Sequence, residues 1–548
     1  MSKIKMFSLG GLNETGKNMF VIEINKNILI FDAGLKYMDS GALGIDYIIP
    51  NTDYLKENIN RIKGIFLTHG HDENIGALED IIPSLDGVNI YAAKFTLDII
   101  KKNFEESHIP TNKLIEIKPH KTITVGGINI FPVSLSHSIP DNLGFAIYTD
   151  DGVIFYASDF VFDSMMTDVY QTDVGKLAYI GKQGVLCLLS ESMFASRPGF
   201  TSPNHRIGSL IKEALSNCEG RIIFNTLSSH LYRIQELFNE VSKTKRKVVI
   251  MGKKLQNIIN DAITNNYLNI NKDIIGDLSN INDNNVIILV STEKEKPYSN
   301  IVKIVNGYDK FIKLKETDTM FIAIPVYVGK EKIYYEMLDN IAKTGSNIIT
   351  LSPKNNLSLH ASQEDLMLML NLMKPKYYFP IKGEYRFQVD NGELAYKLGM
   401  PKENILLKQN GDVVSITDGK LDNRFEHINC EPILIDGDMP DDIGEIVLKD
   451  RELLKDNGIV IVSVTLNKEN KKIIAGPEIL TRGFIYVKDN TVLIRDMSKL
   501  VSDLITTNTR FHYVDYVKLK NLIREELSKF LYKETECNPM IISIIQEI

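Results

Sequence analysis

Cysteine is scarce in this chain, and tryptophan is missing altogether. The four cysteines are spread over 548 residues with no Cys-x-x-Cys pair, which excludes a disulfide-rich secreted fold and predicts a reducing, cytoplasmic setting. No apolar run reaches the 18 residues that a membrane-spanning helix needs. The first residues also lack the apolar core of a signal peptide. We therefore expect neither export nor a membrane partner.

An excess of positive charge is also lacking. The chain carries 63 basic and 70 acidic residues, for a formal charge of −7. This balance argues weakly against a general nucleic-acid binder, although a local basic channel can form within an acidic shell. The apolar fraction of 44% and the charged fraction of 24% are ordinary for a globular protein. The length predicts two or three domains with sizeable cores.

Histidine is rare too, with ten residues in the whole chain, so the sequence Thr68-His69-Gly70-His71-Asp72-Glu73-Asn74 stands out. It follows the apolar run 65–67, and a strand end that carries two imidazoles can begin a metal site. Three more apolar runs end in possible ligands, at His137, Asp159 and Glu191. The plainer interpretation is a loop with two unrelated histidines.

Beyond residue 200 the pattern changes. Alternating β and α patterns over 200–349 predict a parallel α/β insert. Its expected strands are Arg221–Asn225, Lys247–Met251, Val286–Val290 and Met320–Ile324. Strands Ile348–Leu351 and Tyr377–Pro380 are expected around a helix at Gln363–Met373, and a linker rich in Asp, Gly and Pro at 435–442. A small third domain should contain strands Ile459–Val464 and Phe484–Val487 and an amphipathic helix at Tyr516–Leu531.

The run from Thr68 to Ala77 resembles the second motif of the metallo-β-lactamase fold, in the form used by the ribonuclease J family. Blocks at 197–201, 374–377, 383–386, 475–478 and 482–484 are similar to the same family in the same order. The resemblance implies an α/β fold: an αββα metallo-β-lactamase sandwich, an inserted β-CASP domain and a small α+β C-terminal domain. The expected boundaries are 1–199 and 350–432 for the sandwich, 200–349 for the insert, 433–449 for a linker and 450–548 for the last domain.

The resemblance also implies a metal site. His69, His71 and His137 would bind the first Zn or Mn ion, with Asp159 as the bridging ligand, and Asp32 would orient ligands from behind. The second metal needs an aspartate and two histidines where this chain has Glu73, Asn74 and Lys382. Because an ammonium has donors but no acceptor, Lys382 cannot ligate a metal. We expect one metal at most, and Lys382 either fills the second place or turns to solvent. The alternative is a weak, Mn-dependent pair of metals, rescued by Asp72 or Glu73.

At other positions that matter in the family, this chain keeps some of the usual residues and replaces others. The resemblance implies catalytic roles for Glu73, Asp159 and His360, and binding of RNA phosphate by Ser358, His360 and Arg233. However, Leu359 stands where the family has a phosphate-approaching glycine, Glu191 where Asp is usual and His230 where Asn is usual. The loop 291–297 has gained carboxylates, which would oppose RNA.

These features lead to two hypotheses. The first is a ribonuclease J-type protein of RNA processing and mRNA decay, with weak metal-dependent 5′-to-3′ exoribonuclease activity, an endoribonuclease activity as a further option, and support of an active paralogue. The second is a catalytically inactive scaffold subunit of a ribonuclease J complex. The expected partners are RNA, a ribonuclease J paralogue in a homodimer or hetero-oligomer, and an RNA-degradation complex. A hydrolase of small esters is disfavoured by the insert.

Overall fold

The computed structural model divides the chain into two compact units, residues 1–42 with 46–435 and residues 43–45 with 436–548. Each unit is described by itself. The residues that the structure describes are 2–38, 44–327, 329–353, 356, 358–422, 424–437, 445–484, 491–509 and 514–548. None of the helices within these ranges has the length and apolarity that crossing a membrane requires.

Two β-sheets packed face to face form the centre of the first unit, and we call this part the sandwich. One sheet has the order β22-β21-β1-β2-β3-β6-β7-β8 and the other the order β20-β13-β12-β11-β10-β9. The strands of the first are β1 (Lys3–Gly10), β2 (Met19–Ile24), β3 (Asn27–Phe31), β6 (Ile62–Phe66), β7 (Ile90–Ala92), β8 (Leu114–Glu116), β21 (Val414–Thr417) and β22 (Lys420–Asp422). Those of the second are β9 (Ile123–Val125), β10 (Ile128–Ser134), β11 (Leu143–Thr149), β12 (Gly152–Ala157), β13 (Val185–Glu191) and β20 (Tyr377–Ile381).

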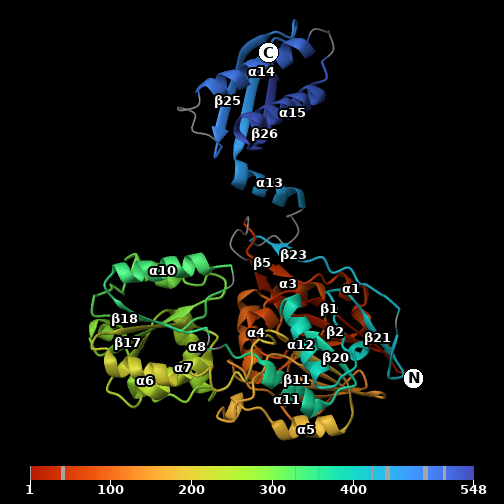
Figure 1. Ribbon diagram of the computed structural model, residues 1–548, viewed down its shortest axis with the longest axis vertical. Helices are drawn as coiled ribbons and strands as arrows, with labels where there is room; N and C mark the ends of the chain where they lie inside the picture. The colour runs from red at the N-terminus through yellow and green to blue at the C-terminus, as the bar shows by residue number, and fades with distance from the viewer. Residues whose placement is uncertain are drawn as a thin grey trace. The chain divides into compact units, whose positions relative to one another are not determined.

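Helices cover the outer face of each sheet, which gives the expected αββα layers (Figure 1). On the first sheet these are α1 (Asp53–Glu57), α2 (Asp72–Ile75), α3 (Leu78–Ile81) and α4 (Lys94–Glu106), and on the second α5 (Val174–Lys182), α11 (Gln363–Met373) and α12 (Tyr385–Lys397). Between the sheets, Phe31 lies within 5.2–5.5 Å of the rings of Phe66, Phe145 and Tyr156. This aromatic core lies directly beneath the strand ends that carry the histidines. A small third sheet, β23-β5-β4, joins Lys36–Tyr37, Tyr47–Ile49 and Ile433–Ile435.

The insert is a six-stranded parallel sheet of order β16-β15-β17-β14-β18-β19, as the alternating pattern predicts. Its strands are β14 (Ile222–Leu227), β15 (Lys247–Ile250), β16 (Ile275–Gly276), β17 (Val286–Thr292), β18 (Thr319–Ile322) and β19 (Asn347–Thr350). Continuous apolar strands suit a sheet that is covered on both faces. Helices α6 (Gly208–Asn217), α7 (Leu231–Val241) and α8 (Lys253–Thr264) cover one face, and α9 (Ser299–Val305) and α10 (Glu331–Lys343) cover the other (Figure 1).

The second unit contains the three-stranded sheet β25-β24-β26, with β24 (Ile459–Leu466), β25 (Ile473–Arg482) and β26 (Met540–Glu547). Helices α14 (Thr491–Asn508) and α15 (Tyr516–Thr535) pack on the face that carries Val460 and Val462. A further helix, α13 (Glu445–Asn457), precedes β24.

Two details differ from the sequence-based expectations. The strand expected at 348–351 is β19, and it pairs with β18 of the insert rather than with the sandwich. The expected linker 433–449 begins in β23, whose Ile433 and Ile435 pack on the sandwich core, and ends in α13. Residues 438–444 of that linker and 485–487 of an expected strand lie outside the described residues.

Candidate metal centre

The candidate ligands all come from the carboxyl ends of strands in the sandwich. His69 and His71 follow β6, His137 follows β10, and Asp159 follows β12. Glu191 is the last residue of β13. Strands that share an orientation present their ends at one edge, and this is why residues far apart in sequence meet here.

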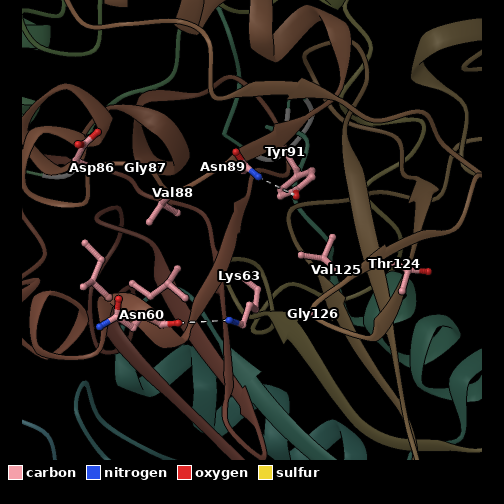
Figure 2. Close-up of a pocket in the computed structure, with 12 residues that line it drawn as sticks. Asn60, Lys63, Asp86, Gly87, Val88, Asn89, Tyr91, Thr124, Val125 and Gly126 are labelled. Carbon is pink, nitrogen blue, oxygen red and sulfur yellow. Dashed lines mark hydrogen bonds between the residues drawn. The ribbon is translucent and has the colours of Figure 1, made fainter.

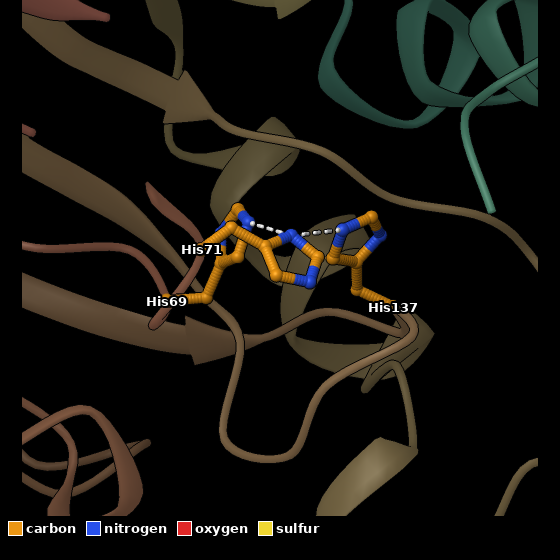
Figure 3. A group of neighbouring side chains, drawn as sticks. All are labelled: His69, His71 and His137. Carbon is orange, nitrogen blue, oxygen red and sulfur yellow. Dashed lines mark hydrogen bonds between the residues drawn. The ribbon is translucent and has the colours of Figure 1, made fainter. Parts of the chain in front are cut away.

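Three imidazoles converge on one point (Figure 3). His69 Nε2 lies 3.0 Å from His71 Nδ1, which lies 3.3 Å from His137 Nε2. Asp159 Oδ2 is 3.5 Å from His69 Nε2. Ligands that bind a tetrahedral zinc ion at about 2.0–2.1 Å are themselves about 3.3–3.4 Å apart. The three imidazole nitrogens therefore have the spacing that one metal ion requires, and Asp159 lies beside His69.

Neighbouring groups keep the imidazoles oriented and neutral. His137 Nδ1 donates to the carbonyl of Leu359 at 2.8 Å, so its Nε2 is left to face the site. His69 Nδ1 lies 3.1 Å from Thr68 Oγ1, which in turn donates to Asp32 Oδ1 at 2.8 Å. Burial lowers the pKa of His137 to about 3 and holds the pKa of His69 and His71 well below the usual value. Neutral imidazole is the form that binds metal, and such hydrogen bonds fix its tautomer.

Asp32 accepts hydrogen bonds from several groups that lie behind the candidate ligands, which is the place that the resemblance implies for it. Its carboxylate accepts from the backbone N–H of Thr68 at 2.9 Å, from Tyr156 Oη at 2.8 Å and from Asn74 Nδ2 at 3.2 Å. Burial raises the pKa of Asp32 to about 6, although its donors and Lys382 oppose that rise.

The groups at the second metal's place do not fit a metal. Lys382 is buried, and its Nζ lies 2.9 Å from Ser158 Oγ and 3.3 Å from Asp159 Oδ1. Burial alone would lower the pKa of Lys382, but the carboxylates of Asp159 and Asp32 raise it above the usual value. The side chain is therefore a charged ammonium that fills the site, and it does not turn to solvent.

The other two altered positions are also occupied by hydrogen bonds. Asn74 Nδ2 donates to Thr68 Oγ1 at 2.8 Å, and Asn74 Oδ1 accepts from Asn18. Both carboxylate oxygens of Glu73 accept from Lys294 Nζ, at 2.6 and 2.7 Å. Lys294 belongs to the insert. Its ammonium is the second one beside the site, after that of Lys382, and it occupies both carboxylate oxygens of Glu73. Sequence reasoning missed this partner, because no local signal links a lysine in the loop 291–297 to Glu73.

Buried Glu191 and half-buried His360 form a pair beside the Asp159 carboxylate. His360 Nδ1 lies 2.8 Å from Glu191 Oε2 and 3.9 Å from Asp159 Oδ1. Glu191 Oε1 accepts from the backbone N–H groups of Phe160 and Ala361. Burial would lower the pKa of His360, but the two carboxylates raise it. Burial also raises the pKa of Glu191. Glu191 is therefore held in the site by hydrogen bonds from three groups, and it is not an ordinary loop residue.

The two remaining predicted residues lie further from the imidazoles. Ser358 is half-buried, and its carbonyl accepts from the backbone N–H of His360 at 3.0 Å. Arg233 lies in the first turn of α7, where Nη1 donates to the carbonyl of Ala323 at 3.0 Å. Neither side chain has a hydrogen bond to the histidines within the described residues.

A cavity of about 490 Å³ lies elsewhere in the sandwich (Figure 2). Asn60 and Lys63 border it at the start of β6, Asn89 and Tyr91 at β7, and Gly126 at the turn between β9 and β10. His69 follows the opposite end of β6, so this cavity is separate from the metal centre.

Comparison with known proteins agrees with this architecture. Family models match residues 27–176 (beta-lactamase superfamily domain), 219–341 (ribonuclease J, beta-CASP domain), 353–403 (Zn-dependent metallo-hydrolase RNA specificity domain) and 446–548 (ribonuclease J C-terminal domain). The chain is 37% identical to ribonuclease J2 of Bacillus subtilis (strain 168), covering 100% of this chain and 99% of that protein. It is 35% identical to ribonuclease J 2 of Staphylococcus aureus (strain NCTC 8325 / PS 47), covering 100% and 98% respectively.

One solved structure adds support for the fold alone. It is a protein of unknown function from Enterococcus faecalis V583, with 16% identity and a TM-score of 0.53. The match covers 76% of this chain and 100% of that one.

Proposed function

This chain belongs to the ribonuclease J family, and from that premise we propose that it is a metal-dependent RNA-processing hydrolase with a one-metal site and weak 5′-to-3′ exoribonuclease activity. An endoribonuclease activity is a further option of the same site. The observation that carries the proposal is the contrast between two neighbouring places. His69, His71 and His137 have the spacing for one metal ion, with Asp159 beside His69, whereas Lys382 contacts Asp159 from the place of the second.

The chain's own residues can divide the work of phosphodiester hydrolysis. A bound Zn or Mn ion would supply Lewis acidity and a water of lowered pKa. Asp159 stays ionised, because burial is outweighed by the Lys382 ammonium and by His360, whose own pKa is raised, and these hold the pKa of the Asp159 carboxyl well below its usual range. His360, held through Nδ1 by Glu191, can carry a proton on Nε2 toward the leaving oxygen.

Activity should be weak because two-metal clamping of the scissile phosphate is lost. Glu73 is the predicted catalytic residue that the geometry favours least, since both its oxygens accept from Lys294. Ser358, His360 and Arg233 remain the proposed contacts to RNA phosphate.

The same observations support a role beside a more active paralogue. The alternative function is therefore an inactive scaffold subunit of a ribonuclease J complex. We take the domain boundaries to be those expected from the sequence, except that β23 (Ile433–Ile435) stays with the sandwich and α13 begins the last domain. The RNA partner is bound by the sandwich and insert, and a homodimer or hetero-oligomer forms through the last domain. An RNA-degradation complex is a further proposed partner. The unpaired cysteines support a cytoplasmic setting.

Metal content tests the proposal directly. The full chain is stripped with a chelator, given excess Zn or Mn, desalted and analysed for metal per chain. We expect at most one tightly bound ion, because an ammonium at residue 382 repels a second dication. Two near-stoichiometric ions would contradict the one-metal site, and none would favour the inactive scaffold. Decay of a 5′-monophosphorylated RNA with and without metal then distinguishes the weak enzyme from the scaffold.

A further inference from the structure

Four hydrogen-bonding groups at one edge of the insert have no partner among the residues that the structure describes. They are His230 Nε2, Arg233 Nε, Arg233 Nη2 and Tyr327 Oη, and each of these atoms is buried. His230 and Arg233 are 8% and 3% exposed. Buried polar groups are nearly always hydrogen-bonded, so a set of unpaired ones calls for an external partner.

The chemistry of these groups specifies an anion. His230 Nδ1 accepts from the backbone N–H of Arg233 at 3.2 Å, so the neutral ring carries its proton on Nε2 and offers a donor. A guanidinium has only donors, and Arg233 uses Nη1 for the carbonyl of Ala323. The hydroxyl of Tyr327 can donate as well. His230 also caps the eleven-residue helix α7, whose amino end favours negative charge.

These groups lie where a parallel sheet usually binds its ligand. His230 follows the carboxyl end of β14, and Tyr327 follows the carboxyl end of β18, its neighbour in the sheet. From β14 the chain proceeds to β15 on one side, and from β17 it crosses to β18 on the other. Crevices at such a switch point, outside the carboxyl ends of the strands, are the common ligand sites of open α/β sheets.

The same edge adjoins the metal centre. The backbone N–H of Tyr232, in the first turn of α7, donates to the carbonyl of Ser138 at 3.2 Å. Ser138 Oγ in turn lies 3.4 Å from His71 Nε2. Lys294, which follows β17 at this edge, contacts Glu73. A ligand held by the unpaired groups would therefore continue into the histidine site.

Two carboxylates near this edge would repel a bound anion if their charges were not paired or reduced. Glu293 accepts from Ser228 Oγ and from Lys254 Nζ at 3.2 Å, so its charge is paired. Glu236 lies one turn further along α7. Its Oε1 accepts from the backbone N–H groups of Ile207 and Gly208, and its Oε2 is a buried acceptor without a partner within the described residues. Burial raises the pKa of Glu236 to about 7, which reduces its charge at neutral pH. The edge therefore remains a donor-rich surface.

We propose that His230, Arg233 and Tyr327 form a binding site for one backbone phosphate of single-stranded RNA, next to the nucleotide at the metal centre. The inference rests on the proposed function. It adds His230 and Tyr327 to Arg233, and it makes this phosphate site distinct from the loop that carries Ser358 and His360. A phosphate contact positions a strand without reading its sequence.

Binding of a cleavage-resistant 2′-O-methyl RNA to the full, metal-loaded chain tests the site by fluorescence anisotropy. Tyr327→Phe removes one unpaired hydroxyl and should weaken binding about fivefold to tenfold, with an unchanged salt dependence. Arg233→Gln removes a charge and should lower the slope of log K against log salt by about 0.7. Tyr308→Phe makes the matched change at a residue 81% exposed, ahead of the amino end of β18, and should bind like the parent.

A neutral linkage identifies the ligand as phosphate. One methylphosphonate, moved along the RNA, should weaken binding to the parent chain at each phosphate that the protein contacts. In Arg233→Gln, the position next to the metal centre that this site holds should lose its effect, while the other sensitive positions keep theirs. If Arg233→Gln fails to fold, Tyr327→Phe and the methylphosphonate scan of the parent decide the question. Parent-like affinity of Tyr327→Phe, or a scan with no sensitive position, overturns the site while RNA binding itself stands. Absence of RNA binding by the parent chain overturns the proposed function as well.

Discussion

The ammonium of Lys382 lies among buried carboxylates and close to three imidazoles, in a place that water scarcely reaches. A buried charge is costly unless it is paired, and here Asp159 and Asp32 provide the pairing. Asp159 consequently faces two ways, with Oδ1 toward the Lys382 ammonium and Oδ2 toward His69 of the proposed metal site. A side chain with a positive charge thus takes the place of a positive ion.

Restoring three residues should convert the site. In the triple variant Glu73→Asp, Asn74→His and Lys382→His, a second metal ion should bind, and exonuclease activity should rise on the order of a hundredfold because both attacking and leaving oxygens are then stabilised. Metal analysis and decay of a 5′-monophosphorylated RNA measure the two effects. Lys397→His, at an exposed position in α12, is the control for an added histidine.

Two results of that experiment would redirect the argument. If two ions bind without any gain in activity, the loop with Leu359, rather than the metals, limits the reaction. If no second ion binds, Lys294 is the remaining obstacle, because it would still face residue 73.

At the scale of elements, an ion-pair cluster fastens the segment that leads from the sandwich into the insert. Asp163, in the loop after β12, accepts from His205 Nε2 at 2.6 Å and from Arg206 Nε at 3.0 Å. It also accepts from the backbone N–H of Met165 at 2.8 Å. Burial opposes ionisation, yet these donors hold the pKa of Asp163 well below its usual range. Burial lowers the pKa of His205.

This cluster predicts a particular dependence of stability on pH. A carboxyl group with a depressed folded pKa contributes stability above its unfolded pKa of about 3.9, and that contribution is lost as pH falls toward the folded value. His205 acts in the same direction below about pH 6.5, because the unfolded chain then binds the extra proton. Asp163→Asn should therefore lower the melting temperature at pH 7. The fall of the melting temperature between pH 5 and pH 3 should be shallower in this variant than in the parent.

Thermal unfolding of the full chain across this range is the measurement. Asp86→Asn changes an exposed aspartate and should reproduce the parent curve. If the melting temperature falls as steeply with acid in Asp163→Asn as in the parent, the Asp163 cluster is not the cause of that fall.

For the molecule as a whole, the sequence could predict elements whose apolar residues follow a regular helix or strand pattern. The helix at Gln363–Met373 coincides with α11, and the parallel strands of the insert are confirmed. What it could not predict is contact between distant segments. The pairing of Lys294 with Glu73, the donors around Asp163 and the placement of β19 all depend on tertiary structure that no local pattern encodes.

Among the described residues of the second unit, the helices α14 and α15 pack on only one face of the sheet. Ile461 pairs with Leu480 on β25 and with Ile542 on β26, and all three point away from the face that α14 and α15 cover. Leu480 and Ile542 are 44% and 41% exposed. Three strands of about 27 Å, spaced about 4.8 Å apart, present roughly 400 Å². A stable two-fold interface needs about 600–1,000 Å² from each partner, so this face can supply about half of one.

We expect the full chain to associate as a dimer or higher oligomer through this face together with other surfaces. Leu480→Glu combined with Ile542→Glu should weaken association at least tenfold, because charged side chains would be buried without partners on both sides of a self-complementary contact. Light scattering across micromolar concentrations measures the change. Val517→Glu, on α15 at 71% exposure, adds a charge elsewhere on the unit and should associate like the parent. A parent chain that is monomeric at these concentrations, and that binds no paralogue added to it, would remove the main support for the scaffold role and leave the weak enzyme as the function to pursue.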